Sequence, residues 1–282
     1  MNRRKFIQKS SLAAGAAIAF SQLPKQLLAA AAAQNIPVGF QSWILRNDIG
    51  KDFAGNLKMM ADQGYSLIEM CSPKSYGDGF ALLRDMKPSE IKKIINDNGL
   101  KCPSCHFGFK ELTGDLDDRI EWSKGIGLEH MVCCSFGMPK ESTISDWQKA
   151  AEQLNKAGEK IKAAGMQAGF HNHSSEFEKL DNELIYDKLL KTFDPQLVKL
   201  QFQTEVINLG YKASDYFKKY PGRFISSHLS DWTSDKQQAA IGHGVIDWKE
   251  FFAAAKKANV KYFYVEMDAD KFKDSIAYIK SL

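Results

Sequence analysis

Short apolar runs alternate with helical patterns along residues 37–282, and this alternation restricts the fold more than any other feature of the sequence. The runs are mostly continuously apolar, which is typical of strands that are buried on both faces in a parallel sheet. Each run is followed by a helical pattern before the next run begins. Eight runs are present: residues 37–43, 66–71, 100–106, 130–135, 166–173, 197–203, 224–229 and 262–267.

The helical patterns have their own start and stop signals. Lys87-Pro88-Ser89-Glu90 is typical of a helix start, and Asn98-Gly99 and Ala164-Gly165 are typical of helix ends. After a first helix with Leu57 and Met60 on one side, helices are expected at residues 88–98, 117–124, 145–164, 182–190, 214–219, 248–258 and 271–280.

Eight strand–helix units predict an α/β fold of one domain, a closed (β/α)8 TIM barrel. A doubly wound open sheet is the alternative architecture. That fold commonly places a glycine-rich phosphate loop after the first strand, and no such loop follows residues 37–43. The barrel is therefore the preferred prediction.

Residues 1–33 resemble an export signal of the twin-arginine type. Arg3-Arg4-Lys5 precedes an alanine-rich apolar run, and the apolar residues 12–20 are too few to span a bilayer. Ala31-Ala32-Ala33 offers a small-residue cleavage site ahead of Gln34. We expect a mature barrel at residues 34–282, periplasmic or exported, without stable membrane insertion after cleavage; an uncleaved anchor is the alternative.

The charge of the mature chain differs from that of the whole sequence. The formal net charge is +4, but residues 1–33 contain five cations and no acid, so removing them leaves −1. A nucleic-acid-binding protein usually presents a basic stripe that supplies much of its affinity. The balance of charge therefore argues against a nucleic-acid partner.

The five cysteines are Cys71, Cys102, Cys105, Cys133 and Cys134, and all lie in or beside apolar runs. An odd number in such positions argues against a disulfide framework. Cys102 and Cys105 have the spacing of half a zinc site, but no second pair completes it. We expect buried thiols.

Polar residues gather where the predicted strands end. In a parallel β/α barrel the active site lies at these carboxyl ends. His171 and His173 close the fifth strand, share one face of it and open into a Ser-Ser-Glu segment. Strand-end positions are predicted for Trp43, Glu69, His106, His171, His173, Gln203, Glu205, His228 and Glu266, and His243 lies in the loop after the seventh strand.

Imidazoles and carboxylates that converge at one barrel mouth suit a divalent cation, with Mn, Zn, Co and Fe all acceptable. Such an ion could polarise a carbonyl and hold adjacent hydroxyls while a carboxylate removes the neighbouring proton. Glu266 is the first choice for a ligand that also shapes this chemistry. Other readings stay open: Glu69 as a structural ion-pair partner, Trp43 as rim packing or a sugar platform, and Gly242-His243-Gly244 as a tight turn or a close approach to ligand.

Several segments carry a family resemblance. They are Leu154-Asn155-Lys156-Ala157-Gly158, Gly169-Phe170-His171-Asn172-His173, His228-Leu229-Ser230-Asp231, Gly242-His243-Gly244 and Val265-Glu266. With them the chain resembles the sugar phosphate isomerase/epimerase family of xylose isomerase-like TIM barrels, in its His-Asn-His subgroup. The resemblance covers residues 36–282 and extends to the endonuclease IV branch of that family.

The resemblance implies a metal held by an acid on the fifth strand, an aspartate on the sixth, a histidine on the seventh and a glutamate on the eighth. His228 and Glu266 match, whereas the fifth position falls on His171 and the sixth on Gln203. Glu205, two residues further along what is expected to be the same strand face, could substitute. The implied metal ligands are then His228, Glu266, His171 and Glu205.

The resemblance also implies the other site roles. Glu266, His171 and His106 are expected to be catalytic. Substrate contacts are expected from Trp43, Glu69, His173, Gln203, Asp231 and His243.

The leading function hypothesis is an exported sugar isomerase or epimerase that transfers a proton next to a carbonyl, assisted by a divalent metal. A lyase that eliminates the aglycone of a 3-keto-glycoside is the close alternative. A catalytically idle carbohydrate-binding barrel and an endonuclease IV-like nuclease belong to other classes. The expected partner is a small sugar or keto-glycoside, and a homo-oligomer remains open.

Overall fold

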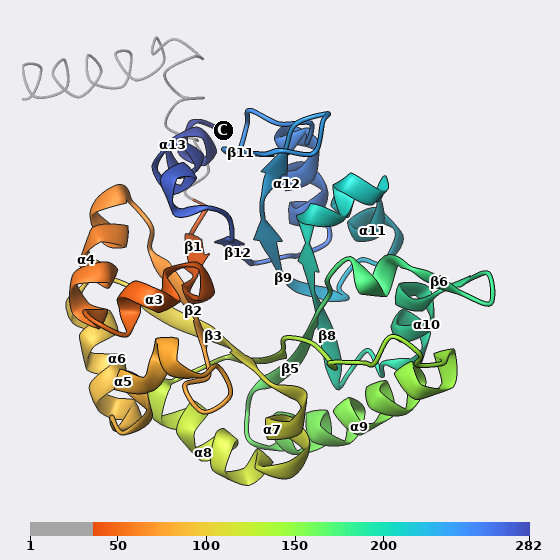
Figure 1. The fold of residues 1–282 in the computed structure, drawn as a ribbon, viewed down its shortest axis with the longest axis horizontal. Coiled ribbons are helices and arrows are strands. Elements are labelled where there is room, and N and C mark those ends of the chain that lie inside the picture. Colours follow the sequence, from red (N-terminus) through yellow and green to blue (C-terminus); the bar gives the residue numbers. More distant parts are fainter. Residues whose placement is uncertain (1–35) are drawn as a thin grey trace, which may run out of the picture. The chain divides into compact units, whose positions relative to one another are not determined.

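Residues 36–282 are described by the computed structural model, and residues 37–279 form one compact unit. Eight parallel strands close into a barrel in the order β1-β12-β9-β8-β5-β4-β3-β2, and Figure 1 shows helices around this ring. The predicted signal peptide, residues 1–33, lies outside the described residues. The barrel strands are β1 (Val38–Gln41), β2 (Leu67–Cys71), β3 (Lys101–Phe107), β4 (His130–Cys133), β5 (Gln167–His171), β8 (Val198–Gln203), β9 (Phe224–Leu229) and β12 (Tyr262–Val265).

All eight predicted strands are therefore confirmed, and so is the closed barrel. Their side chains are nearly all buried because one face packs against the helices and the other fills the barrel. In β8, for example, Leu200 and Phe202 are fully buried among apolar residues, while Gln201 reaches across the barrel interior to Glu69. Alternation along the strands therefore separates an apolar outer layer from a polar interior near the mouth.

The helices that cover the strands are amphipathic. The longest one, α9 (Ile144–Ala163), is capped by Thr143, whose Oγ1 accepts from the Asp146 backbone N–H at 3.3 Å, and it buries Trp147 and Leu154. The helices are α3 (Arg46–Ile49), α4 (Phe53–Gln63), α5 (Ala81–Arg84), α6 (Pro88–Asp97), α7 (Phe109–Gly114), α8 (Leu116–Ile126), α9 (Ile144–Ala163), α10 (Ile185–Thr192), α11 (Ala213–Lys219), α12 (Trp248–Lys257) and α13 (Phe272–Ser281).

The helix predicted at residues 182–190 begins later than expected. Asp181 and Asn182 both have positive φ, 52° and 62°, and form the turn of a hairpin between β6 (Lys179–Leu180) and β7 (Glu183–Leu184). The helix α10 follows this hairpin. The sequence pattern also missed α3, α5 and α7, which are short helices in the loops.

Short elements at the carboxyl ends of the strands shape the barrel mouth. A second hairpin pairs β10 (Asp231–Trp232) with β11 (Gln238–Ala239) directly after β9. The 3-10 turns are η1 (Ser42–Leu45), η2 (Asp78–Phe80), η3 (Ser175–Phe177), η4 (Thr204–Leu209) and η5 (Ala269–Lys271).

All five cysteines are free, and four of them are buried, as the sequence predicted.

None of the helices formed by residues 36–282 combines the length and the apolar composition that crossing a membrane requires.

Candidate active site

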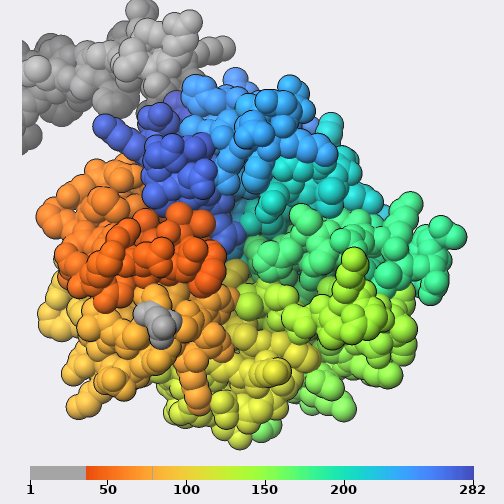
Figure 2. Space-filling view, in the orientation of Figure 1, coloured from red at the N-terminus to blue at the C-terminus, as the bar shows by residue number. Residues whose placement is uncertain are grey.

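A cavity of about 500 Å³ opens at the carboxyl ends of the barrel strands. Figure 2 shows that early, middle and late segments of the chain, coloured orange, green and blue, meet at the centre of this face. Most of the predicted site residues line the cavity. Its walls are Trp43, Ile44, Cys71, Tyr76, His106, Cys134, Ser135, His171, His173, Gln203, Glu205, Ser230, Trp232, Gln238, Glu266, Met267 and Asp268.

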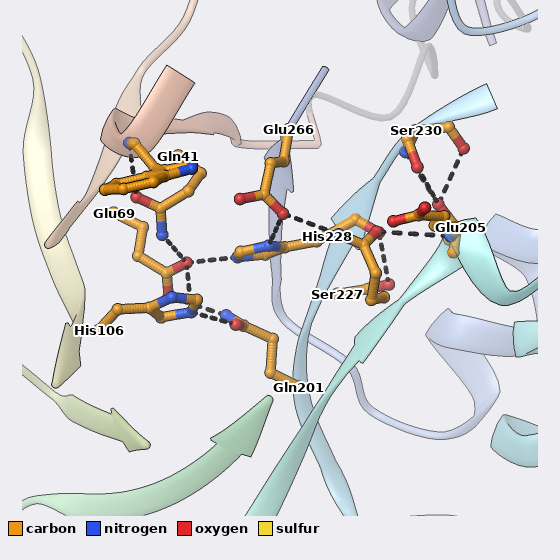
Figure 3. Close-up of polar contacts among 12 residues, drawn as sticks. Gln41, Glu69, His106, Gln201, Glu205, Ser227, His228, Ser230 and Glu266 are labelled. Atoms are coloured by element: carbon orange, nitrogen blue, oxygen red, sulfur yellow. Dashed lines mark hydrogen bonds and ion pairs between the residues drawn. The ribbon is translucent and has the colours of Figure 1, made fainter. Parts of the chain in front are cut away.

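Glu69 lies beneath this cavity and not in its wall. Its carboxylate is fully buried in the middle of β2 and accepts hydrogen bonds from four side chains of the barrel interior. The donors are Gln41 at 2.7 Å, Ser104 at 2.5 Å, Gln201 at 2.8 Å and His228. Nε2 of His106 lies 3.2 Å from Oε2 of Glu69 (Figure 3). The structure therefore does not bring Glu69 to the cavity wall, because the side chain is covered by the residues that it binds.

His228 connects the buried carboxylate to the cavity. One ring nitrogen, Nε2, bonds to Glu69, and the other, Nδ1, lies 2.8 Å from Oε2 of Glu266. The same oxygen accepts from Nε2 of Gln203 at 2.7 Å. Figure 3 shows the resulting chain from Glu69 through His228 to Glu266, and the Glu266 side chain is 18% exposed. Glu266 is thus fixed in place while remaining accessible.

The charges in this chain stabilise one another. Burial alone would lower the pKa of His228, but the carboxylates of Glu266 and Glu69 outweigh burial and raise it to about 10. Burial likewise opposes ionisation of Glu69, yet His106 and His228 lower its pKa to about 2. The pKa of Glu266 is also lowered, because His228 outweighs the effect of burial. At neutral pH the chain therefore contains an imidazolium between two carboxylates.

The histidines on the other side of the cavity are neutral. His171 is buried, and its ring centroid lies 4.4 Å from that of His228 and 4.9 Å from that of His106. Burial and then the charge of His228 lower the pKa of His171 well below its usual value. Burial also lowers the pKa of His106, whose Nε2 donates to Gln201 at 2.6 Å. His173 is exposed at the mouth, 4.8 Å from His171.

Glu205 lines the cavity but does not lie on a strand face. The chain turns into η4 directly after Gln203, whose side-chain oxygen accepts from the Glu205 backbone N–H. The expected continuation of the strand is therefore wrong. Burial, and then the nearby Glu266, raise the pKa of Glu205. The pKa values of Glu205 and Glu266 are thus shifted in opposite directions.

Asp231 and His243 do not line the cavity. Asp231 is fully buried, and its carboxylate accepts from backbone N–H groups of its own hairpin and of the following loop, and from Trp248. His243 is exposed in that loop. The structure therefore does not bring these two predicted substrate contacts to the site, whereas Trp43, His173 and Gln203 do line the cavity.

The site has donors that fit a metal ion. Ring nitrogens of His106, His171 and His228 lie within 4.8 Å of one another, so these three histidines could hold one. His171 Nδ1 is buried and has no hydrogen-bond partner among residues 36–282, which a bound cation would supply. Of the predicted ligands, His171 and His228 belong to this group, His106 joins them, and Glu205 does not.

Sequence reasoning missed most of the polar layer below the cavity. Gln41, Ser104 and Gln201 fix Glu69, and none of them was singled out. Gln201 and Gln203 alternate with Leu200 and Phe202, and this alternation of polar and apolar residues could have identified the side of the strand that faces the barrel interior. Tyr76 comes from a loop, and Trp232 and Gln238 come from the two-residue strands of the hairpin β10–β11, which are too short for a periodic signal.

Comparison with known proteins agrees with this architecture. A family model described as a xylose isomerase-like TIM barrel matches residues 57–282. The chain is similar to an inosose dehydratase from Clostridium perfringens, with 28% identity over 145 residues, which are 44% of this chain and 48% of that protein. It thus matches about half the length of the curated relatives.

Solved structures extend the likeness over nearly the whole barrel. A sugar phosphate isomerase/epimerase from Parabacteroides distasonis has a TM-score of 0.75 at 22% identity, covering 89% of this chain and 98% of that one. The IolI protein with a bound zinc atom has a TM-score of 0.63 at 12% identity, covering 87% and 94%. Because the family model spans most of the sequence and the barrel is closed, this chain belongs to the xylose isomerase-like TIM barrel family.

Proposed function

We propose that this protein is an enzyme that transfers a proton next to the carbonyl of a sugar or related polyol, as an isomerase or epimerase. One observation carries the proposal. The ionised Glu266, held by His228 and Gln203, opens into the same cavity as the neutral imidazole of His171. A fixed carboxylate and a neutral imidazole are the acid–base groups that such a transfer requires.

Glu266 is assigned the role of proton acceptor. Its hydrogen bonds to described side chains both involve Oε2, which leaves Oε1 for the substrate. In the site without a metal, His171, whose Nδ1 has no partner within residues 36–282, is assigned the second proton transfer, at the oxygen or at the adjacent carbon. There the imidazolium of His228 keeps Glu266 ionised before the transfer and stays in place during it.

A divalent metal would be an alternative to the proton roles of His171 and His228. His106, His171 and His228 would then be neutral ligands, and a bound ion would polarise the carbonyl and orient neighbouring hydroxyls. The zinc atom bound by the IolI protein, which has the same fold, supports this assignment. The metal could be Mn, Zn, Co or Fe.

Elimination is the second candidate reaction, as in a dehydratase or a 3-keto-glycoside lyase. It begins with the same proton abstraction, but a leaving group departs from the next carbon. The observation that favours it is His171, which stands where the resemblance expects the second carboxylate of an epimerase. The inosose dehydratase likeness points the same way.

Deuterium incorporation tests the common step. The full-length protein would be incubated in deuterated water, with and without Mn²⁺, with unphosphorylated ketoses, keto-inositols and keto-glycosides, and products followed by NMR. We expect deuterium next to the carbonyl for one class. Retention of all atoms identifies isomerisation or epimerisation, whereas loss of water or aglycone identifies elimination. Tight binding without exchange would favour an idle carbohydrate-binding barrel and contradict the proposal.

Export is a separate part of the proposal and rests on the sequence of residues 1–33, with the pair Arg3 and Arg4 as its most specific feature. We expect the protein outside the cytoplasm in cell fractions. Replacing both residues by lysine should retain it inside, because twin-arginine recognition needs the pair. An unchanged distribution would exclude this route.

A further inference from the structure

The loop after β9 occupies a place with a known use in this architecture. TIM barrels frequently bind a substrate phosphate through backbone N–H groups in the loops that follow the seventh and eighth strands. In this chain β9 is the seventh barrel strand, and its loop contains Gly242-His243-Gly244. The sequence alone left open whether these glycines serve a turn or a ligand.

The structure shows where the N–H groups of this loop are directed. Gly242 and Gly244 both donate to Oδ2 of Asp231 at 3.0 Å, and Ile246 donates to Oδ1 at 3.3 Å. The Trp232 backbone N–H adds a bond to Oδ1 at 3.0 Å, and Trp248 Nε1 adds one to Oδ2 at 2.8 Å. An internal carboxylate thus accepts five hydrogen bonds and takes the donors that an external phosphate would need.

The two glycines make this close approach possible. A Cβ atom at Gly244 would lie 2.1 Å from Oδ1 of Asp231, and one at Gly242 would lie 2.4 Å from the Tyr278 ring. Gly242 also has a φ of +91°, which disfavours other residues. The glycines therefore serve the fit between the loop and Asp231.

The charges around the cavity also disfavour a phosphate. Its described lining includes Glu205, Glu266 and Asp268 and contains no lysine or arginine. Near the mouth, Arg46 stacks on Trp43 with its Cζ 4.1 Å from the ring centroid and donates to the Trp43 carbonyl at 2.9 Å. Lys271 pairs with Asp270 at 3.1 Å and Asp268 at 3.5 Å. A phosphate dianion would meet carboxylates without a lysine or arginine in the described lining to pair with it.

We infer that the substrate is an unphosphorylated, uncharged polyhydroxy carbonyl compound, and that Asp231 fills the phosphate-binding position of the barrel with an anion of the protein itself. This inference rests on the proposed function and narrows its substrate class. Hydroxyl groups would bond to Glu205, Gln203 and His173, and the Trp43 ring would pack against the apolar face of the substrate. The protein then excludes phosphorylated compounds because Asp231 fills the phosphate-binding position and because the mouth of the cavity is negatively charged.

Inorganic phosphate is the direct probe. Backbone amide resonances of Gly242 and Gly244 would be followed by NMR in the full-length protein during a phosphate titration to millimolar concentration. We expect no saturable shift in the wild type and a saturable shift in Asp231→Ala, whose loop donors are released. Saturable shifts in the wild type, or none in folded Asp231→Ala, would overturn the inference.

A second measurement covers the case in which Asp231→Ala does not fold. Wild-type protein would be titrated with D-fructose, 2-keto-myo-inositol and their phosphate monoesters. We expect each detectable free compound to bind at least tenfold more tightly than its ester. Equal or tighter binding of an ester would overturn the inference even if deuterium exchange upholds the proposed function. If no compound of either kind exchanges or binds, the proposed function fails, and the phosphate titration alone decides the inference.

Discussion

The two sides of the site shift the pKa of a buried histidine in opposite directions. On the carboxylate side, formed by Glu266 at the cavity wall and by His228 and Glu69 beneath it, the imidazole has a carboxylate on each ring nitrogen and its pKa rises to about 10. On the imidazole side, formed by His106, His171 and His173, burial and then the charge of His228 lower the pKa of His171, which has no carboxylate partner. The difference shows that partner identity, and not burial alone, decides the charge of a buried histidine, and it divides the site into a fixed ionic half and a neutral half.

The largest expected effect is on the carboxylate side. Glu266→Gln keeps the shape of the side chain but removes the proton acceptor, so we expect deuterium exchange to fall by about 10³-fold or more. Glu178→Gln, a change of the same kind on the exposed surface, is the control and should leave exchange unchanged. Exchange within tenfold of the wild type would remove Glu266 from the mechanism.

The buried carboxylate should matter for stability. Glu69→Gln leaves the charge of His228 with one carboxylate partner, and breaking a buried ion pair costs about 3 to 5 kcal/mol of unfolding free energy. Urea denaturation measures this loss, with Glu159→Gln on the surface of α9 as the matched control. A loss below about 1 kcal/mol, the range of exposed pairs, would show that the Glu69–His228 pair is not the anchor described here.

Changes on the imidazole side should slow deuterium exchange less than Glu266→Gln does, and the effects of His171 and His173 should differ. His171→Asn is expected to slow exchange by about 10²-fold, because its unpartnered Nδ1 is the second proton carrier, and His173→Asn at the exposed mouth by about tenfold. His130→Asn, at the opposite end of the barrel, is the control. Equal effects of the first two changes would contradict the distinct role given to His171.

The unfolding free energy should depend on pH differently in the wild type and in Glu69→Gln. A raised pKa of His228, from 6.5 to about 10, contributes stability that is complete below pH 6.5 and is lost as pH rises towards 10. The lowered pKa of Glu69 contributes stability that is present above pH 4.5 and is lost as pH falls towards 2.

Between pH 6.5 and 8.5, in chelator-treated protein, the wild-type unfolding free energy should therefore decline more steeply than that of Glu69→Gln. The difference should reach up to about 1.4 kcal/mol per pH unit. Denaturation series at several pH values measure it. Parallel slopes would mean that Glu69 does not raise the His228 pKa.

The sequence predicted the barrel well because its signals are local. Eight apolar runs and the helical patterns between them need no knowledge of distant contacts, and all eight strands formed as expected. Strand ends also gathered Trp43, His106, His171 and Gln203 at one mouth, as the parallel topology requires.

The depth of a side chain in the barrel and the geometry of the loops could not be predicted from the sequence in the same way. Glu69 is the third residue of β2 and lies below the cavity, while Glu205 leaves the strand direction because η4 begins at Thr204. Asp231 was predicted to contact substrate, but its carboxylate binds loop N–H groups that lie 11 to 15 residues further along the chain. Such contacts follow from tertiary structure and leave no local pattern.

Protonation of the two histidines is the most direct test of the division within the site. In metal-free full-length protein at pH 7.5, ¹⁵N NMR of the ring nitrogens distinguishes imidazolium from neutral imidazole. We predict that both nitrogens of His228 carry protons and that His171 has one protonated and one bare nitrogen. A neutral His228, or a doubly protonated His171, would contradict the account.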